Sequence, residues 1–282
     1  MKDVHPAGPS RRGLLGAGAL ALGLAAVPSV ARASTPFRVL VFSRTTVFRH
    51  DSIPAGITCV SELGAEHGFG VDTTEDPSVF SRSGLAPYDT VVFLNTTGQV
   101  LDTAAQRAAL ERFVRDGGGF AGVHAAADTE YDWPFYGRLV GAHFKCHPLL
   151  TQPGRLVTEA RHPATSHLAA HFRTCEEFYS FRSNPRPDVR VLLTVDERTY
   201  LPDPNTTNTP VDAAGDYQDW IPGETGYMSG RRGVPGDHPM AWTHANLGGT
   251  AFYTALGHRP GLYSEDWFRR HLLGGILSTR SR

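Results

Sequence analysis

Short apolar runs alternate with helical patterns between residues 37 and 126, and this alternation constrains the fold more than any other feature of the chain. The apolar runs lie at residues 37–43, 69–76, 88–98 and 119–126. Helical patterns separate them at 52–68, where Ser52 is a suitable N-cap, and at 101–118, where Asp102 is one. This order predicts an α/β fold with a mostly parallel sheet and helices on both faces.

The second half of the chain adds a β-rich part. Strand patterns occur at 153–160, 176–181 and 189–197, and residues 238–258 read as a hairpin. An amphipathic helix is expected to begin near Ser264. Residues 201–236 are rich in Pro, Gly, Asn, Asp and Thr, which predicts a long loop. Since no linker pattern divides the chain, residues 34–282 are predicted to form a single domain.

Residues 1–33 have the pattern of an export signal. An Arg11-Arg12 pair precedes the apolar stretch 14–27, and the small-residue pattern Ala31-Arg32-Ala33 follows it. This arrangement predicts a signal peptide of the twin-arginine type. The alternative is a membrane anchor, but the stretch is short for a span and Pro28 breaks the pattern. We therefore expect a secreted or periplasmic protein without a stable membrane anchor.

The charge balance argues against nucleic acid as a partner. Residues 34–282 carry 23 Lys and Arg against 27 Asp and Glu, with no basic run. The cysteines, Cys59, Cys146 and Cys175, are odd in number and lack CxxC spacing, so they predict neither a disulfide framework nor a zinc ribbon. These patterns leave the oligomeric state open.

Histidines follow several of the apolar segments. Ligands of open α/β sheets bind beyond the carboxyl ends of the strands, so histidines placed there are candidates for a shared polar pocket. Five have this placement: His50, His124, His147, His238 and His258. His67, His171 and His271 fit surface or packing roles, and His162 and His167 are left undecided.

A divalent metal is compatible with the sequence, although no established metal motif is present. HxH, HExxH and paired CxxC patterns are absent. His143 and His147 would share one face if their segment were helical, which gives a weak two-ligand pattern. Carboxylates next to the histidine motifs could complete a mixed nitrogen and oxygen site; they are Asp51, Asp128, Glu130, Glu176, Glu177 and Asp237.

General acid–base chemistry is the reaction type that remains. The sequence has no GxSxG elbow. The glycine run GGGFAG at 117–122 follows a helix and enters a strand, the reverse of a phosphate-binding loop, so Gly117–Gly119 are interpreted as a helix end and turn. Histidine titrates near neutral pH, which suits proton transfer. Aromatic residues near the expected edge offer faces for sugar rings or belong to the core; they are Tyr131, Trp133, Tyr136, Trp242 and Tyr253.

A set of motifs resembles the ThuA-like, or trehalose-utilisation, family. The motifs are TTVFRHDSIPAG, GGGFAGVHAAADTEYDWPFYGRLVGAHFKCHP, EEFYSF, DHPMAW and GGTAFYTALGHRPGLY, in that order over most of residues 37–278. The resemblance implies a class I glutamine amidotransferase-like fold, with a flavodoxin-like sheet. In those amidotransferases a Gly-x-Cys elbow presents the nucleophile, and here Gly122-Val123-His124 takes its place. This replacement argues against thiolate chemistry.

The resemblance also implies a role in sugar catabolism and a set of pocket residues. The residues that carry over from the motifs are His50, His124, His147, Glu177, His238 and His258. The long segment 201–236 departs from the family pattern, so the identity of the sugar does not carry over with them.

These observations lead to a function prediction with two rivals. The leading hypothesis is an exported enzyme, a lyase or hydrolase, that cleaves or rearranges a glycoside or keto-sugar. His124 is its central base or ligand, His50, His147 and His258 surround it, and Glu177 is the carboxylate partner. The expected substrate contacts are His238, Trp242, Asp128, Tyr131 and Trp133. The rivals are a non-catalytic sugar-binding protein and an amide hydrolase.

Overall fold

The computed structural model describes residues 36–148, 151–200 and 236–280. Residues Pro36–Arg282 form one compact unit. The predicted signal peptide and all but the last residue of the predicted long loop lie outside the described residues.

Five parallel strands form one half of a nine-stranded sheet. They are β1 (Arg38–Phe42), β2 (Gly70–Thr74), β3 (Thr90–Leu94), β4 (Gly119–Val123) and β11 (Ala251–Thr254), in the order β2-β1-β3-β4-β11. Each pairs in parallel with its neighbour. Strands β3 and β4 are buried along their whole length, because helices cover both faces of the sheet. The predicted mostly parallel α/β core is confirmed.

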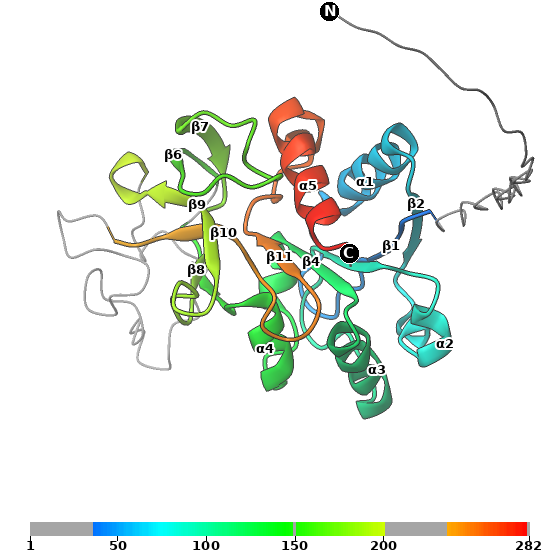
Figure 1. Cartoon of the computed structure of the whole chain (residues 1–282). Helices are drawn as coiled ribbons and strands as arrows, with labels where there is room; N and C mark the ends of the chain where they lie inside the picture. Colours follow the sequence, from blue (N-terminus) through cyan, green and yellow to red (C-terminus); the bar gives the residue numbers. More distant parts are fainter. Residues whose placement is uncertain (1–35, 149–150, 201–235, 281–282) are drawn as a thin grey trace, which may run out of the picture. The chain divides into compact units, whose positions relative to one another are not determined.

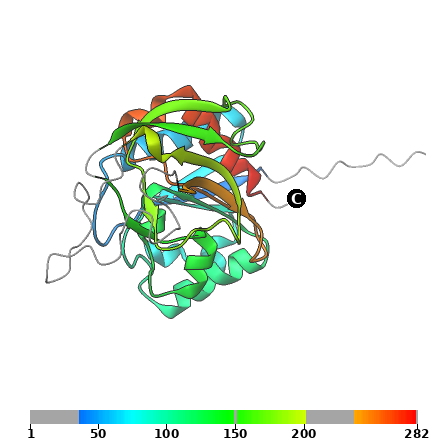
Figure 2. The ribbon, with the colours of Figure 1, turned by 90° about the vertical axis from the view of Figure 1, so that its left-hand side faces the viewer.

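Helices cover the two faces of this half of the sheet (Figures 1 and 2). Helices α1 (Ile53–His67) and α5 (Asp266–Ser278) lie on one face, and α3 (Ala104–Arg115) and α4 (Pro134–Val140) lie on the other. The short helix α2 (Arg82–Leu85) packs beside α3. None of the helices that the structure describes is both long and apolar enough to cross a bilayer.

The ends of the helices follow local signals, with one correction. In α1, Pro54 lies in the first turn and Gly68, with φ of 73°, ends the helix. Helix α3 begins one residue later than expected, because Thr103 rather than Asp102 is the N-cap. The Thr103 hydroxyl accepts from the Gln106 N–H, and the Gln106 side chain accepts from the Thr103 N–H. Asp102 instead pairs with Arg44 at 2.8 Å.

The other half of the sheet is antiparallel. Strands β10 (Pro239–His244), β9 (Arg190–Asp196), β6 (Gln152–Thr158) and β7 (His171–Glu176) extend the sheet beyond β11 in that order. Strands β10 and β11 form the expected hairpin, in which Trp242 lies opposite Tyr253. Four antiparallel steps separate β11 from β7, so β7 runs in the same direction as β11 and its carboxyl end points to the same edge of the sheet.

The strand predicted at 176–181 is wrong. The chain leaves β7 at Glu176, and only Ser180–Phe181 form a further strand, β8, which pairs with β5 (Phe144–Cys146) in a separate two-stranded sheet. Adjacent side chains of a continuous strand point to opposite faces. Glu176 and Glu177 instead both reach residues 257–258, so the chain must turn out of the sheet between them.

Candidate active site

His124 lies on a strained turn at the carboxyl end of β4. Its φ is 48°, a left-handed value that is rare for residues other than glycine, and a short 3-10 helix (His124–Asp128) follows at once. The turn is held from β11, because the Tyr253 hydroxyl donates to the His124 carbonyl oxygen at 2.8 Å. Backbone strain of this kind concentrates at functional sites. A sharp strand-to-helix turn is also the setting in which hydrolases present a nucleophile.

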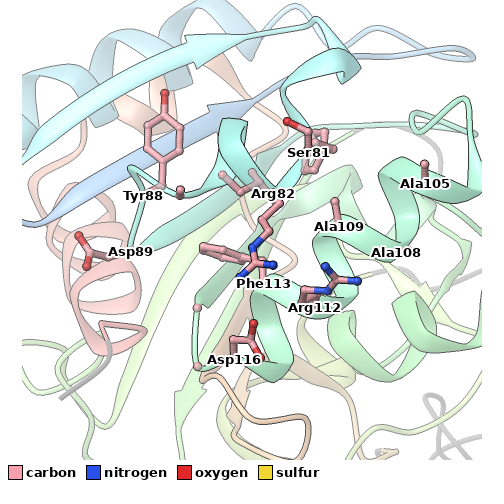
Figure 3. A pocket seen from close by; sticks show the side chains of 15 residues that line it. Ser81, Arg82, Tyr88, Asp89, Ala105, Ala108, Ala109, Arg112, Phe113 and Asp116 are labelled. Atoms are coloured by element: carbon pink, nitrogen blue, oxygen red, sulfur yellow. The ribbon is translucent and has the colours of Figure 1, made fainter.

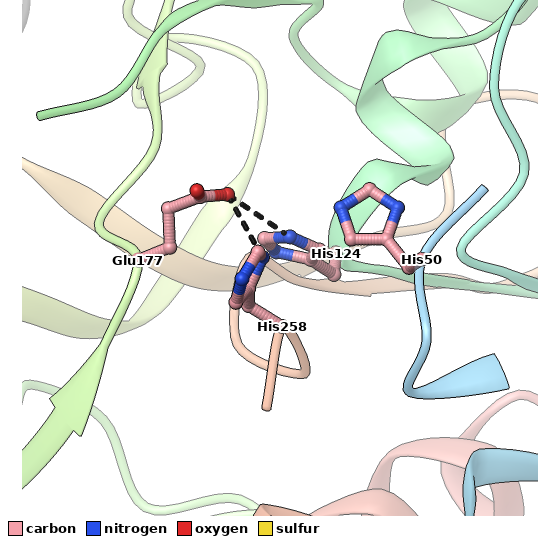
Figure 4. A group of neighbouring side chains, drawn as sticks. All are labelled: His50, His124, Glu177 and His258. Carbon is pink, nitrogen blue, oxygen red and sulfur yellow. Dashed lines mark ion pairs between the residues drawn. The ribbon is translucent and has the colours of Figure 1, made fainter. Parts of the chain in front are cut away.

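Three further side chains converge on His124. His50 comes from the loop after β1, His258 from the loop after β11, and Glu177 from the chain that leaves β7 (Figure 4). Within the described residues, each of these four side chains offers a nitrogen or oxygen atom within 4.8 Å of the others. We refer to His50, His124, Glu177 and His258 as the His–Glu cluster. It sits at the edge of the sheet where the pocket was expected.

Glu177 holds the cluster together. Its Oε2 lies 3.1 Å from Nδ1 of His258 and 3.4 Å from Nε2 of His124. Burial opposes ionisation of this carboxyl, but the contacts with His124 and His258 and the charges of His124 and His147 outweigh it, so the pKa of Glu177 lies below its ordinary value. The carboxylate is therefore ionised at neutral pH.

The hydrogen bond of His124 fixes the direction of its ring. Nδ1 lies 2.7 Å from the carbonyl oxygen of Ala255, and a carbonyl can only accept, so Nδ1 carries the proton. Nε2 then points into the cluster, and it is buried without a hydrogen-bond partner. The ring also packs on Tyr179, with centroids 4.1 Å apart.

The imidazoles of His50 and His258 respond differently to this environment. Burial, together with the nearby His124 and His258, lowers the pKa of His50 to about 2, so this ring stays neutral. His258 is partly exposed, at 27% of its side chain. Burial opposes its protonation, but the contact with Glu177 and the charges of Glu177, Glu176 and Asp51 outweigh burial, and its pKa is raised.

His147 contacts the opposite oxygen of Glu177. Its Nδ1 lies 2.9 Å from the carbonyl oxygen of Pro148 and 3.2 Å from Oε1 of Glu177. Because both neighbours accept, this nitrogen carries a proton and donates to them. His147 therefore orients the carboxylate toward the other histidines.

Glu176 positions the loop that carries His258. This buried carboxylate accepts the backbone N–H groups of Gly257 at 2.6 Å and His258 at 2.9 Å. Burial raises the pKa of Glu176, while these hydrogen bonds lower it. On the far side of the loop, the Ser52 hydroxyl donates to the Gly257 carbonyl at 3.0 Å. The loop after β11 is thus fixed from two elements.

Asp128 and Tyr131 lie together beside the cluster. The Tyr131 hydroxyl donates to Asp128 Oδ1 at 2.7 Å, and the Arg182 guanidinium lies 4.1 Å from the centroid of the Tyr131 ring. Burial raises the pKa of Asp128, although the Tyr131 hydrogen bond and the charges of Arg182, His124 and His147 oppose the shift. The charges of His124 and His147 act on Asp128, so this pair lies near the cluster.

Two predicted substrate contacts are corrected by burial. Trp242 is completely buried, and its indole N–H donates to the Val140 carbonyl at 2.8 Å, so it has no free face for a sugar. His238 is 1% exposed, and its Nε2 donates to the Tyr179 carbonyl at 2.9 Å. It supports the ring that packs on His124 and does not face the pocket. Both residues belong to the segment read as a hairpin, and a strand pattern does not reveal which face is covered.

Trp133 and the His143–His147 pair also differ from expectation. Among the described residues, the ring contacts of Trp133 are with Arg107, Phe135 and Tyr136, outside the cluster. The segment with His143 and His147 is not helical, since α4 ends at Val140 and β5 follows. His143 stacks on Tyr131, with centroids 4.7 Å apart, while His147 faces Glu177. The two-ligand pattern is therefore wrong.

Phe48 is a site residue that the sequence interpretation missed. Its side chain is 59% exposed, and its ring meets His50 edge-on with centroids 4.8 Å apart. Val47 beside it is 75% exposed. Exposed apolar residues at the rim of a polar site are suited to hold an apolar ligand face. Only the unusual placement of a Val-Phe pair in a strand-to-helix loop could have indicated this role.

A cavity lies away from the His–Glu cluster. It has a volume of about 670 Å³ and lies between α2 and α3, where Phe80, Phe113 and Arg112 are among its lining residues (Figure 3). The lining also includes Asp89 and Gly118, which precede β3 and β4. The cavity is therefore at the amino edge of the sheet, opposite the histidines.

Comparisons with known proteins agree with this fold. A sequence model of the ThuA family, described as trehalose utilisation, matches residues 38–278. The structure is similar to that of a protein described as ThuA-like from Bacteroides uniformis, with 23% identity and a TM-score of 0.66 over 88% of this chain and 93% of that chain. A second protein so described, from Parabacteroides merdae, has 18% identity and a TM-score of 0.60 over 87% and 90%. A search of curated proteins finds no match.

Proposed function

This chain belongs to the ThuA, or trehalose-utilisation, family, and on that premise we propose that it is an exported enzyme acting on a carbohydrate at the His–Glu cluster. The family description points to a sugar-related role. The proposed reaction is the cleavage or rearrangement of a glycoside or keto-sugar by acid–base chemistry. Export is proposed from the twin-arginine pattern of residues 1–33.

One observation carries the proposal. Three histidines and a carboxylate, from four separate elements, meet at the carboxyl edge of the sheet within 4.8 Å of one another. Buried polar atoms normally have hydrogen-bond partners, yet ring nitrogens of His50, His124 and His258 have none. Groups held in this way are available to a ligand, and buried ionisable groups gathered in one place are typical of catalytic sites.

Elimination from a keto-sugar fits these residues. A base of the cluster removes the proton on the carbon between the carbonyl and the glycosidic carbon, and the glycosidic C–O bond breaks. The leaving oxygen takes up a proton, and the products are an unsaturated keto-sugar and a free hydroxyl compound. His124 takes the central position, with Glu177 as its partner and His50, His147 and His258 around them. Positioned proton transfer contributes about 10²–10⁴-fold to such a rate.

The sugar would lie between an apolar face and a polar pair. Phe48 offers an exposed ring next to His50, and sugar rings pack their apolar faces on aromatic rings. The Asp128 carboxylate, bonded to Tyr131, offers oxygen acceptors for hydroxyl groups.

The test is a substrate screen with the purified protein without the proposed signal peptide, residues 34–282. Oxidised and unoxidised disaccharides are incubated with the protein, and products are followed by new reducing ends and by the absorbance of an unsaturated ketone. We expect turnover of at least one sugar and its loss in Glu177→Gln. Saturable sugar binding without any product would contradict the enzyme and support a binding protein. Unchanged turnover in Glu177→Gln would show that the reaction does not take place at this cluster.

A further inference from the structure

We infer that the His–Glu cluster binds one divalent transition-metal ion through three imidazole nitrogens and one Glu177 oxygen. The inference concerns the site of the proposed function, but it depends only on geometry and is tested without a sugar. It goes beyond the family assignment, which gives no ligand.

The first reason is the direction of the free nitrogen of His124. Its Nδ1 donates to the Ala255 carbonyl, so in the neutral ring Nε2 has a lone pair, and this lone pair points toward Oε2 of Glu177 at 3.4 Å. A lone pair facing a carboxylate oxygen in a buried site is repulsive unless a proton or a metal ion lies between them. A metal ion removes the repulsion, since both atoms become its ligands.

The second reason is the number of buried nitrogens without partners. Nδ1 of His50, Nε2 of His124 and Nδ1 of His258 are all buried and have no hydrogen-bond partner. His50 and His124 are 5% and 0% exposed, so bulk solvent does not supply the missing bonds. In Figure 4, Glu177 lies on one side of the His124 and His258 rings, with a dashed line to each, and His50 lies on their other side. One ion at their centre satisfies all three nitrogens.

Two of the distances match metal coordination. Ligand atoms about 2.0–2.1 Å from a tetrahedral ion lie about 3.3 Å from one another. Oε2 of Glu177 lies 3.1 Å from the His258 nitrogen and 3.4 Å from the His124 nitrogen. All four ligand atoms fall within 4.8 Å, so side-chain shifts of about 1–1.5 Å close the set around an ion.

The surroundings supply the support that metal ligands need. Metal-bound histidines typically donate their other N–H to a carbonyl or carboxylate, and bound carboxylates accept a further hydrogen bond. His124 donates to Ala255, and Oε1 of Glu177 accepts from His147. Glu176 fixes the backbone of the His258 loop. These contacts restrain His124, Glu177 and the His258 loop before an ion binds.

The ligand set indicates the class of ion. Three imidazoles and one carboxylate suit zinc and the neighbouring first-row metals, whereas Mg²⁺ and Ca²⁺ prefer oxygen ligands. A bound ion would polarise a sugar oxygen in the proposed reaction. His124 would then act as a ligand, and Oε1 of Glu177, paired with His147, stays free of the ion.

The experiment measures metal binding by the full mature chain without sugar. The protein is treated with a chelator, dialysed and titrated with Zn²⁺ by calorimetry. We expect one ion per chain, and at least about 10-fold weaker binding in His258→Ala and in Glu177→Gln. His67 is exposed on α1, so His67→Ala is the matched control and should bind as the wild type does. His258→Ala should fold, since its ring is partly exposed and its loop is held through backbone groups.

A second measurement keeps the test independent of variant stability. Co²⁺ replaces zinc, and its visible absorption bands report nitrogen and oxygen ligands around the ion. We expect these bands in the wild type and their loss or shift in His258→Ala. Binding of less than one ion, or equal binding in wild type, His258→Ala and Glu177→Gln, would overturn the inference. A protein that binds zinc in this way but turns over no sugar would contradict only the proposed function.

Discussion

Phe48 and His124 illustrate two kinds of contribution by single residues. His124 is completely buried on a strained turn; Tyr253 of β11 fixes its carbonyl, and Ala255, the residue after β11, fixes its ring. Phe48 is largely exposed and touches the cluster only through the edge of His50. We therefore propose that His124 takes part in the chemistry and that Phe48 holds the substrate.

Replacing Phe48 with Ala should weaken substrate binding more than chemistry. The loss of one stacking face should raise KM about 3–10-fold and leave kcat within about 2-fold. The measurement is steady-state kinetics on a sugar that the enzyme turns over. The control is Leu277→Ala, which removes an exposed apolar side chain of α5 and should change neither constant. An unchanged KM in Phe48→Ala would remove this residue from the site.

The sequence indicated a site role for His124 but not for Phe48, and the reason is physical. His124 is a polar residue that directly follows an apolar run, and the carboxyl ends of parallel strands meet at one edge. Phe48 is apolar, and an apolar residue in a loop is as compatible with the core as with the surface. Trp242 was misplaced for the converse reason, since its position opposite Tyr253 in the core depends on strand pairing.

At the level of elements, the loop after β11 shows how separate parts of the chain build the site. Glu176, at the end of β7, accepts two backbone N–H groups of this loop. Ser52, before α1, bonds the Gly257 carbonyl from the other side. The position of His258 is therefore set by an antiparallel edge strand and by a helix near the start of the domain.

Replacing Glu176 with Ala should destabilise this loop. The buried N–H groups of Gly257 and His258 would lose their acceptor, which lowers the free energy of unfolding by about 2–3 kcal/mol. Denaturant unfolding measures the change. Asp266→Ala, at an exposed carboxylate in the first turn of α5, should change stability by less than about 0.5 kcal/mol. Equal stability of Glu176→Ala and wild type would show that the loop does not depend on this anchor.

Helix α5 carries a buried histidine that should make stability depend on pH. Nδ1 of His271 donates to the Ala164 carbonyl, and Nε2 accepts from Thr254. Burial, with a smaller contribution from His162 and His167, lowers the pKa of His271 to about 4. The folded state thus favours the neutral ring more than the unfolded state does. The contribution of His271 to the free energy of unfolding is fully present above pH of about 6.5 and is lost as the pH falls toward 4.

His271→Gln isolates this contribution. Between pH 7 and pH 4, the free energy of unfolding of the wild type should fall by up to roughly 3 kcal/mol more than that of the variant. Denaturant unfolding of both proteins at several pH values measures the difference, and the other buried histidines cancel in it. Identical pH slopes for the two proteins would contradict a buried neutral His271.

At the scale of the whole molecule, the direction of the strands brings the cluster together. β1, β4 and β11 are parallel, and β7 regains their direction after four antiparallel steps. His50, His124, Glu177 and His258 all follow these four strands, so they meet although more than 200 positions separate the first from the last. A single sheet thus collects a site that no local motif contains.

The parallel core and the resemblance to the ThuA family could both be predicted from the sequence, and both predictions are confirmed. Alternating apolar runs and helical patterns are local signals, as are the strand-end positions of the cluster histidines. The pairing of β6 with β7, the turn out of the sheet at Glu177 and the burial of His238 depend on contacts between distant segments. Local patterns do not encode such contacts, which explains why the predicted strand at 176–181 was wrong.

The central claim is that the His–Glu cluster carries out chemistry on a sugar, and the kinetics of His124→Gln test it most directly. With a sugar that the wild type converts, kcat/KM should fall by about 10²–10⁴-fold or more in the variant, while circular dichroism shows an intact fold. His67→Ala should keep the wild-type rate. A folded His124→Gln protein with wild-type kcat/KM would contradict the account.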